Sequence, residues 1–243
     1  MGRTARQEST EAGHHVTARC VDGRLVVRRR SCFEAWLETF GSVATRLAWT
    51  VGTYCVMPNH THVVVWTPRR TLGIGMKVVQ ESHARYANDR DGLRCRGHFW
   101  SERYHNVLLP DVEHVVARLR YDARNPVKHG FVATPEAWPY SAHRALIGEE
   151  PPPPWLAVDD VLALVGGREA YRAVVARDDP TLVAELVASF GVPEGVRRAV
   201  DVHAIGIRVV MAVLGCSQAT AYRRLAEGRE NQVTVPVLAQ VTS

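Results

Sequence analysis

The sequence lacks the features of membrane-spanning and secreted proteins. None of its 243 residues lie in an apolar run of the roughly 20 residues that a bilayer-spanning helix needs. The first residues, MGRTARQESTEAG, contain no apolar stretch of the kind found in a secretory signal. The five cysteines are scattered and form no C-x-x-C pair, which argues against a disulfide framework or a cysteine-rich zinc site. We therefore expect a protein of a reducing compartment, the cytosol, without a membrane partner.

Lysine is also scarce, so arginine supplies most of the positive charge. The formal net charge is +5, and only Lys77 and Lys128 are lysines among 30 basic residues. Residues 1–154 hold 21 Lys and Arg against 15 Asp and Glu, whereas residues 155–243 hold 9 against 10. A basic first part suits a polyanionic partner such as DNA. Because an arginine-rich composition can also reflect genome bias, charge alone does not decide the function.

Hydrophobic periodicity predicts an α+β fold for the basic part. Runs rich in β-branched residues predict strands at 14–20, 48–57, 60–66 and within 98–109, and helical spacing predicts helices at 31–47, 72–88 and 111–125. Ser31 with Glu34, and Asp111, are the expected helix caps. The last helix should end at Asn125, because Pro126 disfavours helical geometry there. This order predicts a ferredoxin-like antiparallel sheet with helices on one face, which leaves the other face open for a site.

Composition divides the chain into two parts. Residues 1–12 are polar and are expected to be disordered, and residues 13–150 form the predicted α+β domain. The tetraproline at 151–154 is the expected linker, because proline runs are stiff and extended. Residues 155–243 are predicted to form a small, all-helical module. Within it, residues 207–228 fit either a helix-turn-helix or a plain helical hairpin.

The strongest candidate for a site is the sequence MPNHTHVVV at 57–65. Alternate residues of a strand share one face, so His60 and His62 project together and can bind one metal ion. The alternative is that they are polar residues at a sheet edge. His14 and His15 are possible additional ligands, although a solvated strand start explains them better. Thr61 should point into the core.

Three separated motifs carry a resemblance to a known family. They are MPNHTH at 57–62, RYDARNPVKHGFV at 120–132 and WPYSAHRALIG at 138–148, and the segment HVTAR at 15–19 precedes them in the expected order. Together they resemble the single-tyrosine HUH transposases, in the REP-associated (RAYT-like) branch. The chain departs from the pattern at Thr61, where the family has a hydrophobic residue.

The resemblance implies a DNA strand-transfer enzyme. It implies that Tyr121 is the nucleophile, that His60, His62 and Asn125 are metal ligands, and that the metal is Mg²⁺ or Mn²⁺. The substrate would be single-stranded DNA beside a hairpin, and the intermediate a 5′-phosphotyrosine. Two histidines with an amide are a poor match for a structural zinc site. The sequence shows no small-molecule cofactor. A location in the bacterial cytosol, at the nucleoid, fits this function.

Basic and aromatic side chains outside these motifs are candidates for DNA contacts. The candidate basic residues are Arg69, Arg70, Arg90, Arg94, Arg96, Arg103, Lys128, Arg223 and Arg224. Phe99, Trp100 and Tyr104 can stack on unpaired bases or pack in the core. The alternative function is a DNA-binding regulator that keeps the fold without turnover.

Overall fold

The computed structural model describes residues 8–21, 27, 29–89 and 98–233. The chain divides into two compact units between Val175 and Ala176, and each unit is described by itself. The described elements of the first unit are β1 (Gly13–Arg19), α1 (Arg30–Arg46), β2 (Thr50–Val56), β3 (His60–Trp66), α2 (Leu72–Asp89), β4 (His105–Leu109), α3 (Val112–Lys128), η2 (Pro135–Ala137), α4 (His143–Leu146), α5 (Val158–Val165) and α6 (Arg168–Ala176).

A four-stranded antiparallel sheet forms the centre of the first unit. The strand order is β2-β3-β1-β4, and in the register of β1 and β3 Thr17 lies opposite His62 and Arg19 opposite His60. The α+β class and the predicted order of strands and helices are confirmed. The last strand, predicted within 98–109, is β4.

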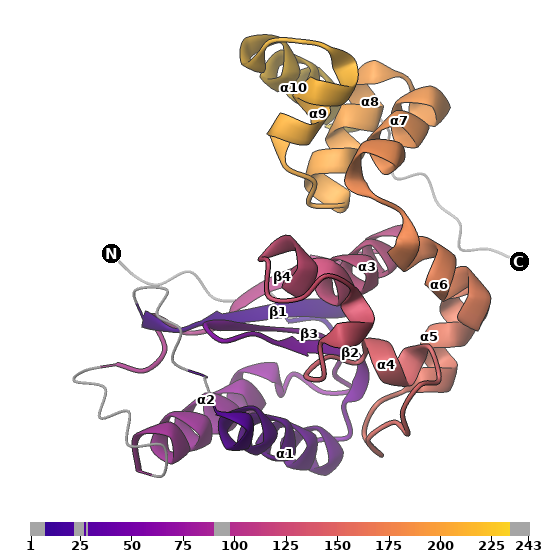
Figure 1. Ribbon diagram of the computed structural model, residues 1–243. Coiled ribbons are helices and arrows are strands. Elements are labelled where there is room, and N and C mark those ends of the chain that lie inside the picture. Colours follow the sequence, from indigo (N-terminus) through magenta and orange to yellow (C-terminus); the bar gives the residue numbers. More distant parts are fainter. Residues whose placement is uncertain (1–7, 22–26, 28, 90–97, 234–243) are drawn as a thin grey trace, which may run out of the picture. The chain divides into compact units, whose positions relative to one another are not determined.

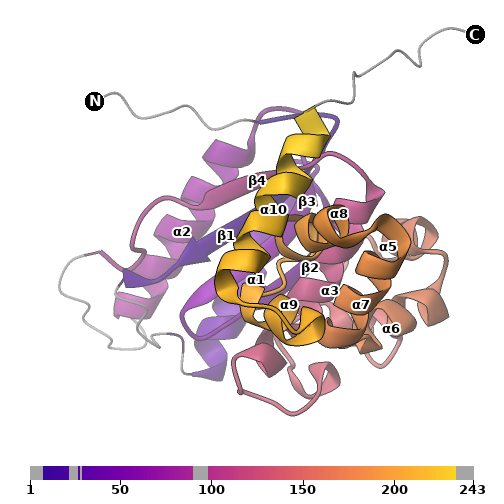
Figure 2. The ribbon, with the colours of Figure 1, turned by 90° about the horizontal axis from the view of Figure 1, so that it is seen from above.

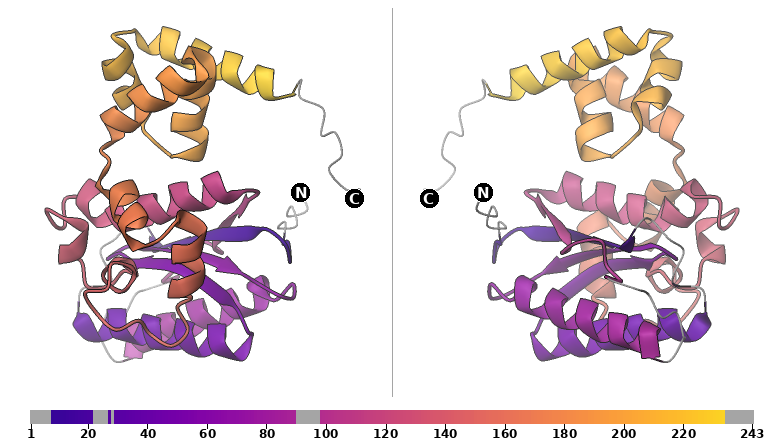
Figure 3. Two further views of the ribbon diagram at one scale, coloured as in Figure 1. Left: turned by 90° about the vertical axis from the view of Figure 1, so that its right-hand side faces the viewer. Right: turned by 90° about the vertical axis from the view of Figure 1, so that its left-hand side faces the viewer.

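The helices are not confined to one face of the sheet, in contrast to the expectation. Helices α1 and α2 cover one face, and α3 crosses the other (Figures 1 and 3). The apolar stripe of α3 explains its position, because Val115, Leu119 and Ala123 are buried. The face that was predicted to be open is therefore covered by the helix that carries Tyr121.

Two local predictions about helix ends are wrong. The N-cap of α1 is Arg29 and not Ser31, and Glu34 accepts a hydrogen bond from the Arg30 side chain (2.6 Å) instead of completing a capping box. Helix α3 continues through Pro126 to Lys128. The helical pattern of backbone hydrogen bonds continues after the proline, because the Asn125 carbonyl oxygen accepts a hydrogen bond from the His129 N–H (3.1 Å). The predicted cap Asp111 is confirmed, since its side chain accepts from the His114 N–H.

The segment after α3 completes the first unit instead of leaving it. The Trp138 indole donates to the carbonyl of Val56 (3.1 Å), so the third motif runs along the outer edge of β2. Beyond the tetraproline, Leu156 bridges to Val51, and α6 buries Tyr171 completely in the same core. The boundary therefore lies after Val175 and not at the proline run, because the residues after the prolines bury apolar surface against the sheet.

The expectation that residues 1–12 are disordered is wrong for residues 8–12, which the structure describes. Residues 8–12 have defined positions, and the Glu8 carboxylate accepts a hydrogen bond from the Gly73 N–H (2.9 Å). Residues 1–7 lie outside the described part of the chain.

The second unit is helical, as its composition predicts. Its elements are α7 (Asp179–Phe190), α8 (Val192–Arg197), the π-helical turn η3 (Arg198–Val202), α9 (Ile207–Leu214) and α10 (Gln218–Val233). It has a hydrophobic core of its own, which includes Leu186, Val196, Val210 and Leu225. Helix α10 packs along α8 (Figure 2), where a Cβ on Gly228 would come within 2.3 Å of the Pro193 carbonyl oxygen. No helix among the described residues is long and apolar enough to cross a bilayer.

Candidate active site

Strand β3 places two histidines of the site side by side under α3. His60 and His62 share a strand face, both are buried, and their ring centroids are 4.8 Å apart at an interplanar angle of 90°. Thr61 points to the other face and is buried in the core, as expected. A stiff strand in the middle of a sheet holds such a pair more rigidly than a loop would.

Helix α3 brings Tyr121 and Asn125 over the two histidines. The two residues are one turn apart, so they lie on the same helix face. His60 Nε2 is 3.0 Å from Asn125 Oδ1, and the Tyr121 ring lies 5.4 Å from the His62 ring. The structure thus brings together all four residues that the resemblance implied.

The facing atoms of His60 and Asn125 fit a hard divalent ion. Asn59 Oδ1 lies 2.6 Å from His60 Nδ1, which favours the tautomer with its proton on Nδ1 and leaves a lone pair on Nε2. Two donor atoms at about 2.1 Å from an octahedral Mg²⁺ are roughly 3 Å apart, which is the separation of Nε2 and Asn125 Oδ1. The buried Nε2 of His62 has no hydrogen-bond partner among the described residues, so it is also available as a ligand.

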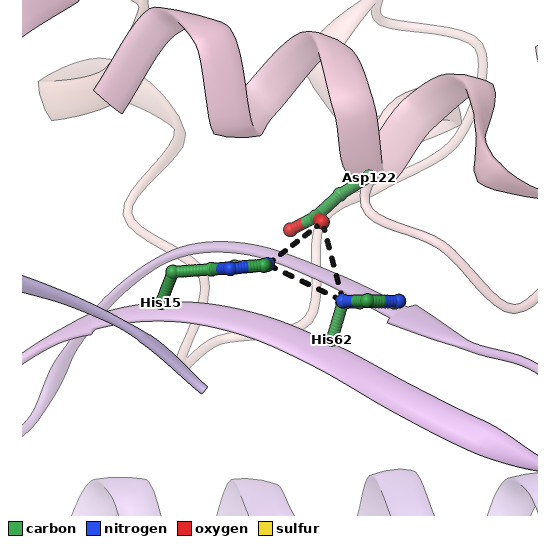
Figure 4. Close-up of side chains that lie close together, drawn as sticks. All are labelled: His15, His62 and Asp122. Carbon is green, nitrogen blue, oxygen red and sulfur yellow. Dashed lines mark hydrogen bonds and ion pairs between the residues drawn. The ribbon is translucent and has the colours of Figure 1, made fainter. Parts of the chain in front are cut away.

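The other ring nitrogen of His62, Nδ1, lies close to Thr17, His15 and Asp122. Of these three residues, only His15 was considered as a possible ligand from the sequence. His62 Nδ1 lies 3.2 Å from Thr17 Oγ1, 3.3 Å from His15 Nε2 and 3.8 Å from Asp122 Oδ1, and His15 Nε2 is 3.2 Å from that same carboxylate oxygen. Figure 4 shows the three side chains converging from β1, β3 and α3. His15 and Asp122 are both buried, so the expectation that His15 marks a solvated strand start is wrong.

The alternation within HVTAR was a signal that could have revealed these residues. His15, Thr17 and Arg19 occupy every second position of β1 and therefore share a face. The register places Thr17 opposite His62 and Arg19 opposite His60. Asp122 had no comparable signal, because its proximity to His15 depends on how α3 crosses the sheet.

The cluster therefore offers two places where a metal can bind. One uses Nε2 of His60, Nε2 of His62 and Oδ1 of Asn125. The other uses His15, His62 and Asp122, whose ligand atoms all lie within 4.8 Å of one another. Both sets include His62, but through different ring nitrogens.

Burial sets the protonation of the site. It lowers the pKa of His60 to about 4, with further lowering by His129 and Arg19, and it holds the pKa of His62 well below its ordinary value. Both rings are therefore neutral at physiological pH, as metal binding requires. Burial also raises the pKa of Tyr121, and Asp122 adds to this effect. Arg118, Arg19 and a hydrogen bond with Asn125 act in the opposite direction.

Only some of the predicted basic residues lie near this centre. Lys128 Nζ lies 5.0 Å from the centre of the Tyr121 ring. Arg103 instead lines a pocket with Lys77 and Gln80 of α2, the helix on the sheet face opposite α3. Arg69 and Arg70 are exposed beyond the far end of β3, at least roughly 20 Å from His60 along the strand.

The remaining predicted basic residues lie either in the second unit or outside the described residues. Arg223 and Arg224 lie in α10 of the second unit. Arg90, Arg94 and Arg96 lie outside the described residues.

The aromatic candidates for base stacking belong to the core. Phe99, Trp100 and Tyr104 are buried, and the first two pack against the His83 ring. Tyr54 is likewise buried, and burial raises its pKa far above the ordinary value. Tyr121 is therefore the tyrosine that lies beside the histidines, and it is only partly buried.

Comparisons with known proteins agree with this geometry. No family profile matches the chain. A curated protein of Haemophilus influenzae, described as a REP-associated tyrosine transposase, is 27% identical over 112 residues, which are 42% of this chain and 63% of the relative. The solved structure of a REP-associated tyrosine transposase bound to a REP hairpin has the same fold, with a TM-score of 0.52. The resemblance to the REP-associated tyrosine transposases is confirmed.

Both matches cover only part of the proteins compared. The chain spans 63% of the length of its curated relative, a little under two thirds. The solved REP-associated transposase is 16% identical, and the match covers 61% of this chain and 87% of that one. The structural match therefore establishes the fold and not the ligand.

Proposed function

We propose that the chain is a metal-dependent DNA strand transferase of the REP-associated transposase type, acting on single-stranded DNA beside a hairpin. One observation carries the proposal: Tyr121 and Asn125 of α3 face the two histidines of β3. The Tyr121 ring lies 5.4 Å from the His62 ring, and Asn125 Oδ1 lies 3.0 Å from His60 Nε2. A nucleophile beside a set of hard-metal ligands is the arrangement that phosphodiester transfer needs. A cytosolic, nucleoid-associated location belongs to the same proposal.

The chemistry is set by the positions of these residues. Mg²⁺ or Mn²⁺ held by His60, His62 and Asn125 would withdraw charge from a non-bridging phosphate oxygen. Tyr121 Oη attacks phosphorus, a bond to the tyrosine forms, and the bond to the 3′-oxygen breaks. The tyrosine proton is lost and the leaving 3′-oxygen gains a proton, so the products are a 5′-phosphotyrosine and a free 3′-hydroxyl. Burial raises the pKa of Tyr121, and the positive charges of Arg118 and Arg19 oppose this rise and so favour the tyrosinate.

His15 and Asp122 have a positioning role in this proposal. A metal-bound histidine usually has a partner at its other ring nitrogen, which fixes the tautomer and the ring orientation. Thr17, His15 and Asp122 surround Nδ1 of His62 and leave its Nε2 toward the metal ligands. We therefore place the metal on the Nε2 side, with His15 and Asp122 behind it.

The second unit adds a helix-turn-helix to the proposal. Helix α9 ends at Leu214, its C-cap Gly215 is left-handed with a φ of 58° and a ψ of 36°, and α10 begins at Gln218. The Ser217 hydroxyl accepts a hydrogen bond from the Thr220 N–H (3.3 Å) and so caps α10. A glycine turn between two helices that share a core is the arrangement of this motif.

The test is covalent capture of DNA by the protein. Labelled single-stranded DNA with a hairpin is incubated with the protein and Mn²⁺, the mixture is denatured, and the adduct is mapped by peptide mass. The proposal expects the label on Tyr121. Metal-independent binding without an adduct would instead support the alternative, a DNA-binding regulator with this fold.

A further inference from the structure

The second unit carries as many acidic as basic residues, but their pairing is uneven. Residues 176–243 contain seven arginines and seven Asp or Glu residues, so the unit has no net charge. Four arginines are paired with acids on α7, α8 and η3: Arg177 with Glu185, Arg197 and Arg198 with Glu194, and Arg229 with Asp201. Residues 176–206 hold three arginines and five Asp or Glu residues, so the part of the unit before α9 has no excess of positive charge.

The remaining three arginines lie on the helix-turn-helix. Arg208 is in the first turn of α9, and Arg223 and Arg224 are in the second turn of α10. Arg208 and Arg224 make no ion pair with any residue that the structure describes. Arg223 meets Glu227 at 3.8 Å, but both side chains are exposed, and such surface pairs are weak. The helix-turn-helix therefore keeps a positive charge that the rest of the unit has lost.

Helix α10 has one buried and one exposed face. Ala221, Leu225 and Gly228 are buried against the unit. Gln218, Ala219, Tyr222 and Arg223 are exposed, and half of the Tyr222 surface is accessible although its ring is large and apolar. An exposed stripe of Gln, Ala, Tyr and Arg has the side chains that read bases and too few apolar ones to need a protein cover.

We infer that α9 and α10 bind double-stranded DNA, with the exposed face of α10 in the major groove. This inference rests on the helix-turn-helix of the proposed function, but not on the chemistry of Tyr121. Gln218 and Arg223 are both exposed on α10, and amide and guanidinium groups pair with adenine and guanine edges in that groove. Ala219 lets the backbone approach, while Arg208 and Arg224 supply phosphate contacts. Charge complementarity favours DNA, because residues 207–233 hold four arginines against two glutamates, Glu227 and Glu230.

The protein would then have two DNA sites with different preferences. The buried centre of the first unit takes one strand, because its nucleophile and ligands handle a single phosphate at a time. The helix-turn-helix takes a duplex, because an α-helix fits the major groove of B-form DNA. Binding at the duplex site would select the position on longer DNA at which the strand-transfer site acts.

The test uses the full-length Tyr121→Phe protein, so that no cleavage interferes. Duplexes with a randomised centre are selected for binding in the presence of excess single-stranded DNA, and the selected duplex is measured by fluorescence anisotropy at several salt concentrations. We expect Arg223→Ala to weaken binding to the selected duplex roughly tenfold or more. The triple change Arg208→Ala, Arg223→Ala and Arg224→Ala should reduce the slope of log affinity against log salt by about two to three.

Arg229→Ala is the matched control, because it removes the same charge from the same helix. Its side chain is paired with Asp201 and should leave duplex affinity unchanged. Thermal unfolding of each variant verifies that the second unit is folded. Equal effects of Arg223→Ala and Arg229→Ala, or failure to select any duplex over single strands, would overturn the inference.

The same variants separate this inference from the proposed function. In the protein with an intact Tyr121, Arg223→Ala should still form the covalent adduct with a short hairpin-flanked single strand. If the adduct forms but no duplex is selected, the duplex site is wrong and the strand transferase stands. If a duplex is selected and no adduct forms, the reverse holds.

Discussion

Helices α3 and α10 carry similar polar residues in opposite environments. Helix α3 presents Tyr121 and Asp122 toward the histidines of the sheet, where Asp122 is buried and Tyr121 partly buried. Helix α10 presents Tyr222 and Arg223 to solvent. Burial changes the chemistry of a polar group, since it shifts pKa values and removes competing water, whereas exposure preserves the group for contact with another molecule. The difference is the basis of the reaction that we propose at α3 and of the recognition that we infer at α10.

The sharpest way to break this comparison is to remove one hydroxyl from each helix. Tyr121→Phe should lower covalent capture of DNA by more than about a thousandfold, because the nucleophile is lost. Tyr222→Phe is the matched control and should capture DNA at the level of the unmodified protein. The measurement is the labelled protein band after denaturation. An undiminished adduct in Tyr121→Phe, or an adduct mapped to Tyr104, would refute the assignment.

Truncation tests the boundary between the two regions. A chain that ends at Glu150 should lose more than about 5 kcal/mol of stability, because several large core side chains are removed together. The losses include Trp155, Leu156 and Tyr171, which pack in the first core. A chain that ends just after α6 keeps them and should fold. Thermal unfolding of the two proteins measures the difference, and equal stability would place the boundary at the tetraproline after all.

Variants of α3 residues can decide whether the metal binds at Nε2 of His62, with Asn125, or at Nδ1, with Asp122. Asn125→Ala should lower Mn²⁺ affinity, measured by titration calorimetry, by more than Asp122→Asn does, because Asn125 is a proposed ligand. Loss of an outer partner such as Asp122 typically costs roughly 10- to 100-fold. His60→Ala and His15→Ala form a second pair with the same expected order. If His15→Ala and Asp122→Asn abolish binding while Asn125→Ala leaves it unchanged, the metal lies among His15, His62 and Asp122.

The smallest expected effect concerns the two lysines. Lys128→Ala removes a cation 5.0 Å from the Tyr121 ring and should weaken single-stranded DNA binding a few-fold. The slope of log affinity against log salt should decrease by about 0.7, the contribution of one phosphate contact. Lys77→Ala is the control, since Lys77 pairs with Glu81 on the exposed side of α2. Equal effects of the two changes would show that Lys128 acts only through net charge.

Much of the candidate site could be predicted from the sequence, because the spacing of residues within one strand or one helix fixes which side chains share a face. The i, i+2 spacing of His60 and His62 and the i, i+4 spacing of Tyr121 and Asn125 each fix a shared face within one element. The motifs then supplied the pairing between the two elements. His15 was noticed but assigned to solvent, and the helix caps at Ser31 and Asn125 were wrong because packing and an Arg30–Glu34 pair override local preference.

The sequence by itself determined the α+β class, the order of strands and helices and the helical second unit, and it led to the four residues that we propose for the site. Only the tertiary structure decided that α3 covers the second face of the sheet, that α5 and α6 belong to the first core, and that Asp122 reaches His15 behind His62. It also decided which arginines of the second unit are paired. The physical reason is that periodicity and spacing act along the chain, whereas burial, ring orientation and ion pairing depend on contacts between elements distant in sequence.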